Sequence, residues 1–294
     1  MNPDQLAALV AVVDGGSFEA AARALHVTPS AVSQRIKALE LHWGRVLVVR
    51  AMPCRATPDG QILLRLARQM AELQADVLTE LTPAGGQRRR LPVVVNADSL
   101  ATWFLPVLSD AAGWDDCALE LLIEIEDHGT EHLRTGQAVG AVTSDPVVVP
   151  GCTIEPLGTL RYLPVCTPAL ADAYRTSNGV DWQRMPMMRF SAADDLQHRL
   201  LERHGVREVE VEHVIPSNQG YLAGVLTGLG WGVVSEPQLG DSLQTGALVR
   251  LGARDHVDVH LAWQSWRLGS TATVRLTESV HRAARRGLRP ARRA

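Results

Sequence analysis

Polar side chains able to contact nucleic acid recur at helical spacing between residues 30 and 37 of this chain. They are Ser30, Ser33, Gln34 and Lys37, with Arg35 toward the flank. Residues three and four apart share one face of a helix, and hydroxyl, amide and ammonium groups contact phosphates and base edges in the major groove. A solvated polar face on an ordinary helical hairpin has the same pattern. Periodicity alone therefore leaves both interpretations open.

The elements that would hold these side chains are two short helices joined by a tight break. Thr28 stands where a helix-capping residue belongs, and Pro29 occupies the first helical position. Apolar residues that recur at helical spacing and are expected to face inward are Phe18, Ala21, Ala22 and Leu25 in the first helix and Val32, Ile36 and Leu39 in the second. The pattern predicts a helix-turn-helix.

The charge balance requires any contact with DNA to be local. The chain has 294 residues, 46% of them apolar, and a formal net charge of -3, which suits two or three domains of ordinary size. Lys37 is its only lysine. Arginine suits guanine edges and phosphates better, because its guanidinium can form two parallel hydrogen bonds to them. The arginines near the predicted helix pair are Arg35, Arg45, Arg50 and Arg55. We expect the basic run 282–293 to be solvated or to end a helix.

The same composition predicts a cytoplasmic protein without a membrane partner. No apolar run of about 18 residues is present, and Asp4 stands near the start where a secretory leader would be basic. The four cysteines, Cys54, Cys117, Cys152 and Cys166, lack the spacing of metal ligands. We expect them to be buried thiols and expect no metal; a redox-sensing role for Cys54 is the alternative.

A long helix with one apolar stripe is predicted from Asp59 to about Leu81. The stripe consists of Ile62, Leu63, Leu66, Met70, Leu73, Val77 and Leu81. Such a stripe needs a partner, and packing on the chain's own core is the alternative to pairing with a second copy. A break at 83–87 and three arginines at 88–90 follow the helix, and we interpret this segment as a linker.

Strands alternating with helices after residue 90 predict a largely parallel sheet. The first unit contains strands at 91–95, 118–125 and 139–143, a helical segment with Trp103, Leu105 and Leu108, and a helix at 129–134; the second contains strands at 161–165, 211–214 and 232–234 and a helix at 220–226. The segment 263–268 is expected to cross back to the first unit. The expected architecture is two α/β lobes with a cleft between them, similar to periplasmic binding proteins.

The first sixty residues resemble the amino-terminal signature of LysR-type bacterial transcriptional regulators. The agreement lies in the run 16–18, Ala20-Ala21, Ala24-Leu25, the run 28–33, Ile36, Leu39-Glu40, Gly44, Leu47, Arg50, Thr57 and Gly60. Trp43 and Val48 depart from the leucine and phenylalanine usual in the family, and we expect both to preserve packing. The resemblance implies a winged helix-turn-helix that binds double-stranded DNA. It also implies a homodimer formed through the long helix, and two such dimers can pair into a tetramer.

Later segments are similar to the LysG/ArgP-like branch of this family. They are 95–104, 140–143, 150–152, 157–158 and 263–264. Members of that branch control export of basic amino acids, so the resemblance implies a small-molecule effector, lysine first and arginine next, and an exporter gene as target. The residues implied in DNA contact are Thr28, Ser30, Ser33, Gln34, Arg35, Lys37, Arg50 and Arg55.

An amino acid with a basic side chain needs partners for one carboxylate and two cations. Helix amino termini offer N–H groups to carboxylates, and a partly desolvated cation needs an anionic or carbonyl partner. Polar residues that follow strands, with Trp103 as a wall of the cleft, give the expected effector set Asp98, Ser99, Thr102, Trp103, Glu126, Asp127, Thr143, Asp145 and Ser217. Each has an ordinary alternative: Asp98 or Ser99 caps a helix, Glu126 and Asp127 are loop charges, and Trp103, like Trp231, belongs to a core.

These expectations divide the chain into three parts. Residues 1–58 form an all-α winged helix-turn-helix domain, 59–90 a linker helix with its hinge, and 91–294 an α/β effector domain. Its first lobe covers about 91–160 and 265–294, and its second about 161–264. An amino-acid-metabolising enzyme with a helical extension and a transport-type binding module are the alternatives. The chain has no nucleophile elbow, metal spacing or phosphate loop, and 228–232 has a tight-turn pattern without dinucleotide-binding spacing. We therefore expect neither catalysis nor a cofactor.

Overall fold

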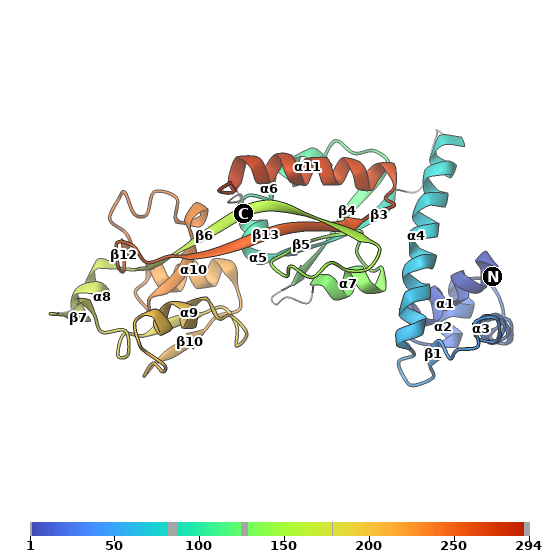
Figure 1. Ribbon diagram of the computed structural model, residues 1–294, viewed down its shortest axis with the longest axis horizontal. Helices are drawn as coiled ribbons and strands as arrows, with labels where there is room; N and C mark the ends of the chain where they lie inside the picture. The colour runs from blue at the N-terminus through green and yellow to red at the C-terminus, as the bar shows by residue number, and fades with distance from the viewer. Residues whose placement is uncertain (1, 82–87, 125–128, 178, 291–294) are drawn as a thin grey trace.

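The computed structural model describes residues 2–81, 88–124, 129–177 and 179–290. A small helical domain occupies one end, a long helix follows it, and a two-lobed α/β domain forms the rest (Figure 1). The long helix α4 stands between the helical domain and the first lobe, so it contacts both.

The amino-terminal domain is built from three capped helices and a short hairpin. The elements are α1 Pro3–Gly15, α2 Phe18–Ala24, α3 Pro29–Trp43, β1 Val48–Val49 and β2 Arg55–Ala56. The Thr28 hydroxyl caps α3 by accepting a hydrogen bond from Ala31 N (3.2 Å), and Ser17 caps α2 in the same way. The helix-turn-helix prediction is confirmed, with Val32, Ile36 and Leu39 fully buried, while Phe18 and Leu25 lie at the edge of the core.

The hairpin is tied to the end of α3 by a carboxylate. Glu40 Oε1 accepts hydrogen bonds from Leu47 N (3.0 Å) and Val48 N (3.4 Å). Gly60 lies so close to this junction that a Cβ would stand 2.1 Å from the Leu47 carbonyl oxygen, which excludes any side chain there. Val48 packs in the core as expected, whereas Trp43 is 47% exposed at the helix end and does not.

Helix α4, Pro58–Leu81, uses its first half for packing within its own domain. Leu63, Leu64 and Ala67 are buried in the same core as residues of α1, α2 and α3. Placing Leu63 on the unpartnered stripe was therefore wrong, because that part of the helix completes the core of the small domain. The stripe that stays exposed contains Ile62, Leu73, Val77 and Leu81, which are 40 to 74% exposed.

Another face of α4 is bound to the first lobe. Asp76 accepts a hydrogen bond from Arg89 Nη1 (2.6 Å) and, through its second oxygen, from Thr271 N (2.8 Å) at the start of α11. Arg68 donates to the Thr135 carbonyl (2.5 Å) and pairs with Asp14 of α1. These bonds fix the linker helix to the domain that follows it.

The main sheet is mixed, with the strand order β11-β6-β13-β5-β3-β4, and β12 also pairs with β6. Three strands, β3 Arg89–Asn96, β4 Cys117–Glu124 and β5 Gly140–Thr143, are mutually parallel. The prediction of a largely parallel sheet is correct for them and wrong for the remainder. The remaining strands, β6 Cys152–Cys166, β11 Gly232–Ser235, β12 Val249–Arg250 and β13 Val257–Trp266, pair antiparallel.

Two long strands join the lobes and explain that difference. The predicted strand at 161–165 is the end of β6, and the segment 263–268, which was expected to cross back to the first unit, contains the end of β13. These two strands run side by side through both lobes (Figure 1). Because β6 spans residues 152–166, the expected lobe boundary at 160 falls inside a continuous strand. The predicted strand at 211–214 is β10, Glu212–Val214, which pairs only with β9, Met187–Arg189.

Helices cover both lobes. The first lobe carries α5 Ala97–Ala101, α6 Leu105–Ala111, α7 Gly129–Thr135 and α11 Thr271–Gly287, and the second carries α8 Pro168–Ala173, α9 Leu196–Arg203, α10 Asn218–Leu226, the 3-10 helix η1 Glu236–Leu239 and the small hairpin β7 Arg175–Thr176 with β8 Gly179–Val180. The single helical segment expected after Ser99 is two helices with a turn between them.

Gly228 has a φ of +79°, in keeping with the tight turn expected there. Within the described residues no helix is long and apolar enough to cross a membrane.

Candidate functional site

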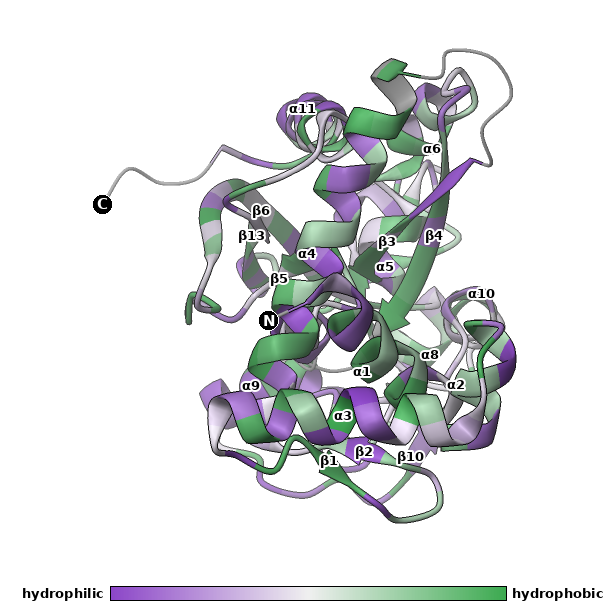
Figure 2. Cartoon of the chain, turned by 90° about the vertical axis from the view of Figure 1, so that its right-hand side faces the viewer, coloured by the Kyte–Doolittle hydropathy of each residue, from purple (hydrophilic) through white to green (hydrophobic). Residues whose placement is uncertain are grey.

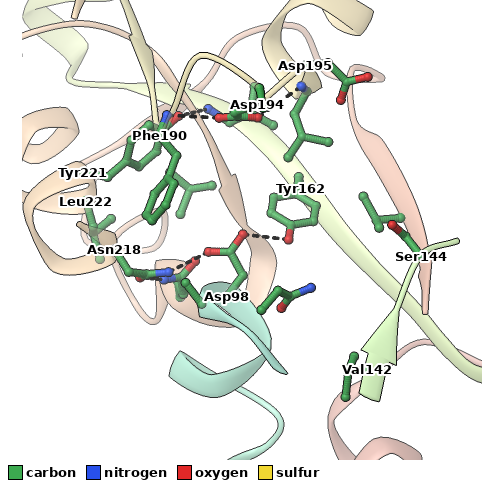
Figure 3. A pocket seen from close by; sticks show the side chains of 18 of the residues that line it. Asp98, Val142, Ser144, Tyr162, Phe190, Asp194, Asp195, Asn218, Tyr221 and Leu222 are labelled. Carbon is green, nitrogen blue, oxygen red and sulfur yellow. Dashed lines mark hydrogen bonds between the residues drawn. The ribbon is translucent and has the colours of Figure 1, made fainter. Parts of the chain in front are cut away.

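A cavity of about 460 Å³ lies between the lobes, at the carboxyl ends of the parallel strands β3 and β5 (Figure 3). This is the edge at which ligands bind in open α/β sheets. Its polar lining consists of Asn96, Asp98, Thr143, Ser144, Tyr162, Asp194, Asp195, Asn218, Tyr221 and Gln238. Its apolar lining consists of Val94, Ala97, Val142, Phe190, Ala193, Leu196, Leu222, Val233, Val234 and Val259.

Asp98, in the first turn of α5, forms hydrogen bonds to two other elements that line the cavity. Tyr162 of β6 donates its hydroxyl to Oδ2 (2.7 Å), and Asn218 at the start of α10 donates Nδ2 to Oδ1 (2.6 Å) (Figure 3). Burial raises the pKa of Asp98, the two hydrogen bonds act in the opposite direction, and the negative charge of Asp194 adds to the increase. Burial beside this carboxylate also holds the pKa of Tyr162 well above its usual value. Tyr162 is therefore a fixed donor.

A chain of side-chain hydrogen bonds continues from Asp98 into the second lobe. Gln238 donates to Asn218 Oδ1, and the Ser235 hydroxyl donates to Gln238 Oε1 (2.6 Å). The amide of Asn218 is thereby oriented with its NH₂ group toward Asp98. The carboxylate thus has fixed donors on two sides, and each of its oxygens keeps lone-pair capacity for a further donor.

The loop before α9 supplies two more carboxylates to the cavity. Asp194 accepts from Phe190 N (3.1 Å), Leu196 N (3.2 Å) and Gln197 Nε2 (3.1 Å). Asp195 is exposed, and its side chain makes no capping bond to α9. With Asp98, these residues give the lining three carboxylates, and the described lining contains no lysine, arginine or histidine. A cavity with this charge and an apolar wall suits a small cation with a hydrocarbon stem.

The structure brings two of the expected effector residues, Asp98 and Thr143, into the cavity lining. Ser99 follows Asp98 on α5 and is fully buried, because consecutive helical residues point about 100° apart. Thr102 and Trp103 lie in the turn after α5, where the Thr102 hydroxyl donates to the Asp98 carbonyl (2.6 Å) and Trp103 packs in the core. None of these three lines the cavity.

The other expected effector residues have local bonding roles or lie outside the described chain. Asp145 donates its N–H to the Thr143 hydroxyl (2.9 Å) and accepts from Val147 N, and Ser217 caps α10 by accepting from Gly220 N (3.1 Å). Neither lines the cavity. Glu126 and Asp127 lie outside the described residues.

Sequence reasoning missed most of the cavity wall contributed by the second lobe. Tyr162, Phe190, Asp194, Asp195, Asn218 and Gln238 were not singled out. Two signals could have found some of them. Adjacent aspartates precede an amphipathic helix at 196–203, and Asn218 follows Ser217, which was selected. Tyr162 gives no such signal, since it lies inside an apolar strand.

The DNA-contact residues expected from the sequence lie on and around α3, which crosses the outer face of the amino-terminal domain (Figure 2). Thr28, Ser30, Gln34, Lys37, Arg50 and Arg55 are exposed, and Ser33 is half-buried. A hollow of about 450 Å³ beside the start of α3 is lined by Ser30, Ser33, Arg50 and Met52, among others. Arg35 is also half-buried and pairs with Asp4 of α1 (3.3 Å), so it has a structural partner within the domain.

The cysteines are free and buried, as the sequence predicts. Burial raises the pKa of Cys152 to about 11 and that of Cys166 to about 12, so both are protonated thiols of low reactivity near neutral pH. The described residues contain no group of histidine, cysteine and acidic side chains arranged to hold a metal ion.

Two families match the chain, one for each domain. Residues 3–61 match the bacterial regulatory helix-turn-helix protein of the lysR family, and residues 84–285 match the LysR substrate binding domain. The second match alone covers more than half of the chain. The helix-turn-helix and the two lobes therefore correspond to separate, known units.

Named relatives are similar over almost the full length. The lysine export transcriptional regulatory protein LysG of Corynebacterium glutamicum is 43% identical over 99% of this chain and 100% of its own. The structure of full-length LysG from that organism with bound effector Arg matches with a TM-score of 0.88 at 43% identity, covering 99% of this chain and 100% of the other. ArgP from Mycobacterium tuberculosis matches with a TM-score of 0.91 at the same identity and coverage. The chain belongs to the LysR family of bacterial transcriptional regulators.

Proposed function

We propose that this protein regulates transcription by binding DNA through α3 and a basic amino acid, arginine or lysine, in the cavity between its lobes. The observation that carries the proposal is the cavity lining, with three carboxylates and no cationic side chain among the described residues. The α-carboxylate of the ligand would meet the hydroxyls of Thr143 and Ser144 and the backbone of the first turn of α5. The cationic groups would meet the aspartates.

The named relatives support the same function. LysG is named for lysine export, and its structure contains arginine as effector. By extension, we propose that this protein acts as a cytoplasmic homodimer that activates a gene for an amino-acid exporter. Ligand binding would bias one arrangement of the lobes, provided that the ligand has a different affinity for the two arrangements.

The enzyme alternative has less support than regulation, because the named relatives are transcriptional regulators. The described lining of the cavity contains no histidine, cysteine or lysine to serve as base or nucleophile. The three aspartates form ordinary hydrogen bonds or face solvent. No observation favours a second function over regulation.

Thermal unfolding with each amino acid in turn tests the effector assignment. A ligand that binds only the folded protein raises the melting temperature by mass action, so arginine and lysine are expected to raise it and glutamate is not. A gel-shift with DNA from beside the protein's own gene, with and without arginine, tests the regulatory half. Stabilisation by acidic or neutral metabolites alone would contradict the assignment of a basic effector.

Two residues on the exposed face of α3 are expected to contribute differently to DNA binding. Gln34→Ala should cost roughly 1–3 kcal/mol at the preferred operator and relax base preference, if the amide makes a bidentate base contact. Lys37→Ala should weaken binding to all sequences alike and reduce the salt dependence, as expected for a phosphate contact. Titration of operator and scrambled DNA at several salt concentrations measures both. Wild-type affinity and selectivity in both variants would remove α3 from the interface.

The raised pKa of Asp98 predicts that arginine affinity depends on pH. A cation pairs only with the ionised carboxylate, so affinity should fall as the pH is lowered through this raised pKa, and binding should release the proton that Asp98 carries there. Calorimetry across a pH series, in two buffers of different ionisation heat, measures the affinity and the protons released. An affinity that rises as the pH is lowered would contradict the role of Asp98.

A further inference from the structure

The three carboxylates of the cavity differ in how many hydrogen-bond donors they already have. Asp194 accepts from three groups of its own loop and of α9, so it holds the loop 190–196 in shape. Asp98 accepts from Tyr162 and Asn218, one on each oxygen. Asp195 is exposed in the cavity wall, and no described residue donates a hydrogen bond to its side chain. Asp195 therefore has its full capacity for a ligand.

The shape of a basic amino acid assigns its two cationic groups to different walls of the cavity. The α-carboxylate and the α-ammonium share one carbon, so their partners must lie close together. Asp98 satisfies this condition, because it follows β3, and Thr143 and Ser144 lie at the end of the neighbouring paired strand β5. The side-chain cation lies several bonds farther along and must meet a different part of the wall. Figure 3 places Asp194 and Asp195 apart from Asp98, with Tyr162 and Phe190 near the space between them.

We infer, building on the proposed function, that Asp195 is the residue that determines specificity for a basic side chain, by pairing with the ligand's distal cation. Asp98 pairs with the α-ammonium that every amino acid carries. Phe190 and Leu222, both in the apolar lining, contact the hydrocarbon stem between the two ends. The buried carboxylate thus recognises an amino acid, and the exposed one distinguishes arginine and lysine from neutral side chains.

Comparison of arginine with citrulline tests this inference, because citrulline has the same length and carries a neutral urea in place of the guanidinium. Calorimetry on the full-length protein should show that the wild type prefers arginine by roughly tenfold to a hundredfold, the range of charged hydrogen bonds. Where citrulline binds too weakly for direct titration, its competition against arginine gives the affinity. In Asp195→Asn the preference should fall to near one, with citrulline affinity unchanged.

Three further variants control for charge and for folding. Asp195→Glu keeps the carboxylate and should retain most of the preference. Asp195→Ser keeps a residue type favoured at a helix start, and this variant should lose the preference for arginine over citrulline, as Asp195→Asn does. Glu208→Gln removes the same charge from an exposed position of the second lobe outside the cavity, and should leave the preference at the wild-type value.

The outcomes separate this inference from the proposed function. An arginine preference that persists in both Asp195→Asn and Asp195→Ser overturns the role of Asp195. Equal loss of arginine and citrulline in these variants, with an unchanged circular dichroism spectrum, also overturns it, because the residue would then act on the part that the two ligands share. A wild-type protein that binds neither arginine nor lysine overturns the proposed function itself.

Discussion

Replacing Asp98 by asparagine is expected to abolish arginine and lysine binding. The substitution keeps the shape of the side chain and removes the charge that the ammonium needs, so affinity should fall on the order of a hundredfold or more. Burial raises the pKa of Asp98, so the substitution removes a charge that folding disfavours. It also replaces one of the two oxygens that accept from Tyr162 and Asn218 by an NH₂ group that cannot accept, so the two changes act on the stability of the ligand-free protein in opposite directions.

Melting curves with and without arginine measure the loss of binding. Arginine should raise the melting temperature of the wild type and should no longer raise that of the variant. Binding of citrulline should be lost together with binding of arginine, whereas substitution of Asp195 is expected to weaken arginine binding alone. Asp172→Asn is the matched control, because Asp172 is exposed in the second lobe and pairs with Arg175 (2.7 Å) far from the cavity lining. Wild-type stabilisation of Asp98→Asn by arginine would place the ligand elsewhere.

A charge in the exposed stripe of α4 is expected to convert a dimer into monomers. Val77 is 54% exposed and lies on the same side of the helix as Leu73, so Val77→Asp should break pairing without disturbing the core of the amino-terminal domain. Leu66 is a poorer position, since it packs partly against that core. A monomer has one DNA-binding domain and loses the affinity that a dimer gains from two linked contacts with the operator. Operator affinity should therefore fall by about a hundredfold or more.

Sedimentation at micromolar concentration and operator titration check this prediction. Ala71→Asp is the control, because Ala71 is an exposed residue on the far side of the helix from Leu73 and should leave the dimer intact. If the wild type itself sediments as a monomer, the stripe has another partner. If Val77→Asp stays dimeric and keeps its operator affinity, pairing uses a different surface.

The amino-acid sequence alone determined α2, α3 and α4 and the three parallel strands of the first lobe. A capping threonine before Pro29 and buried side chains at Val32, Ile36 and Leu39 are properties of neighbouring residues, and they define α3 wherever it packs. The strand before Asp98 and the helical segment that contains it follow from the same local signals. These signals place the carboxylate at the carboxyl end of a strand of the sheet. Local patterns predict local structure because capping and helical periodicity act within a few residues.

Only the tertiary structure decided which residues share the cavity and which face of a helix is left exposed. Asp98 and Asn218 are 120 residues apart and meet because β6 and β13 run through both lobes, a pairing that strand periodicity does not reveal. Leu63 and Val77 have the same helical pattern, yet one is buried in the small domain and the other is exposed. We assign the ligand's distal cation to Asp195 and not to Asp194, because Asp194 already accepts three hydrogen bonds within the protein. Each of these outcomes depends on long-range contacts, which no window of neighbouring residues contains.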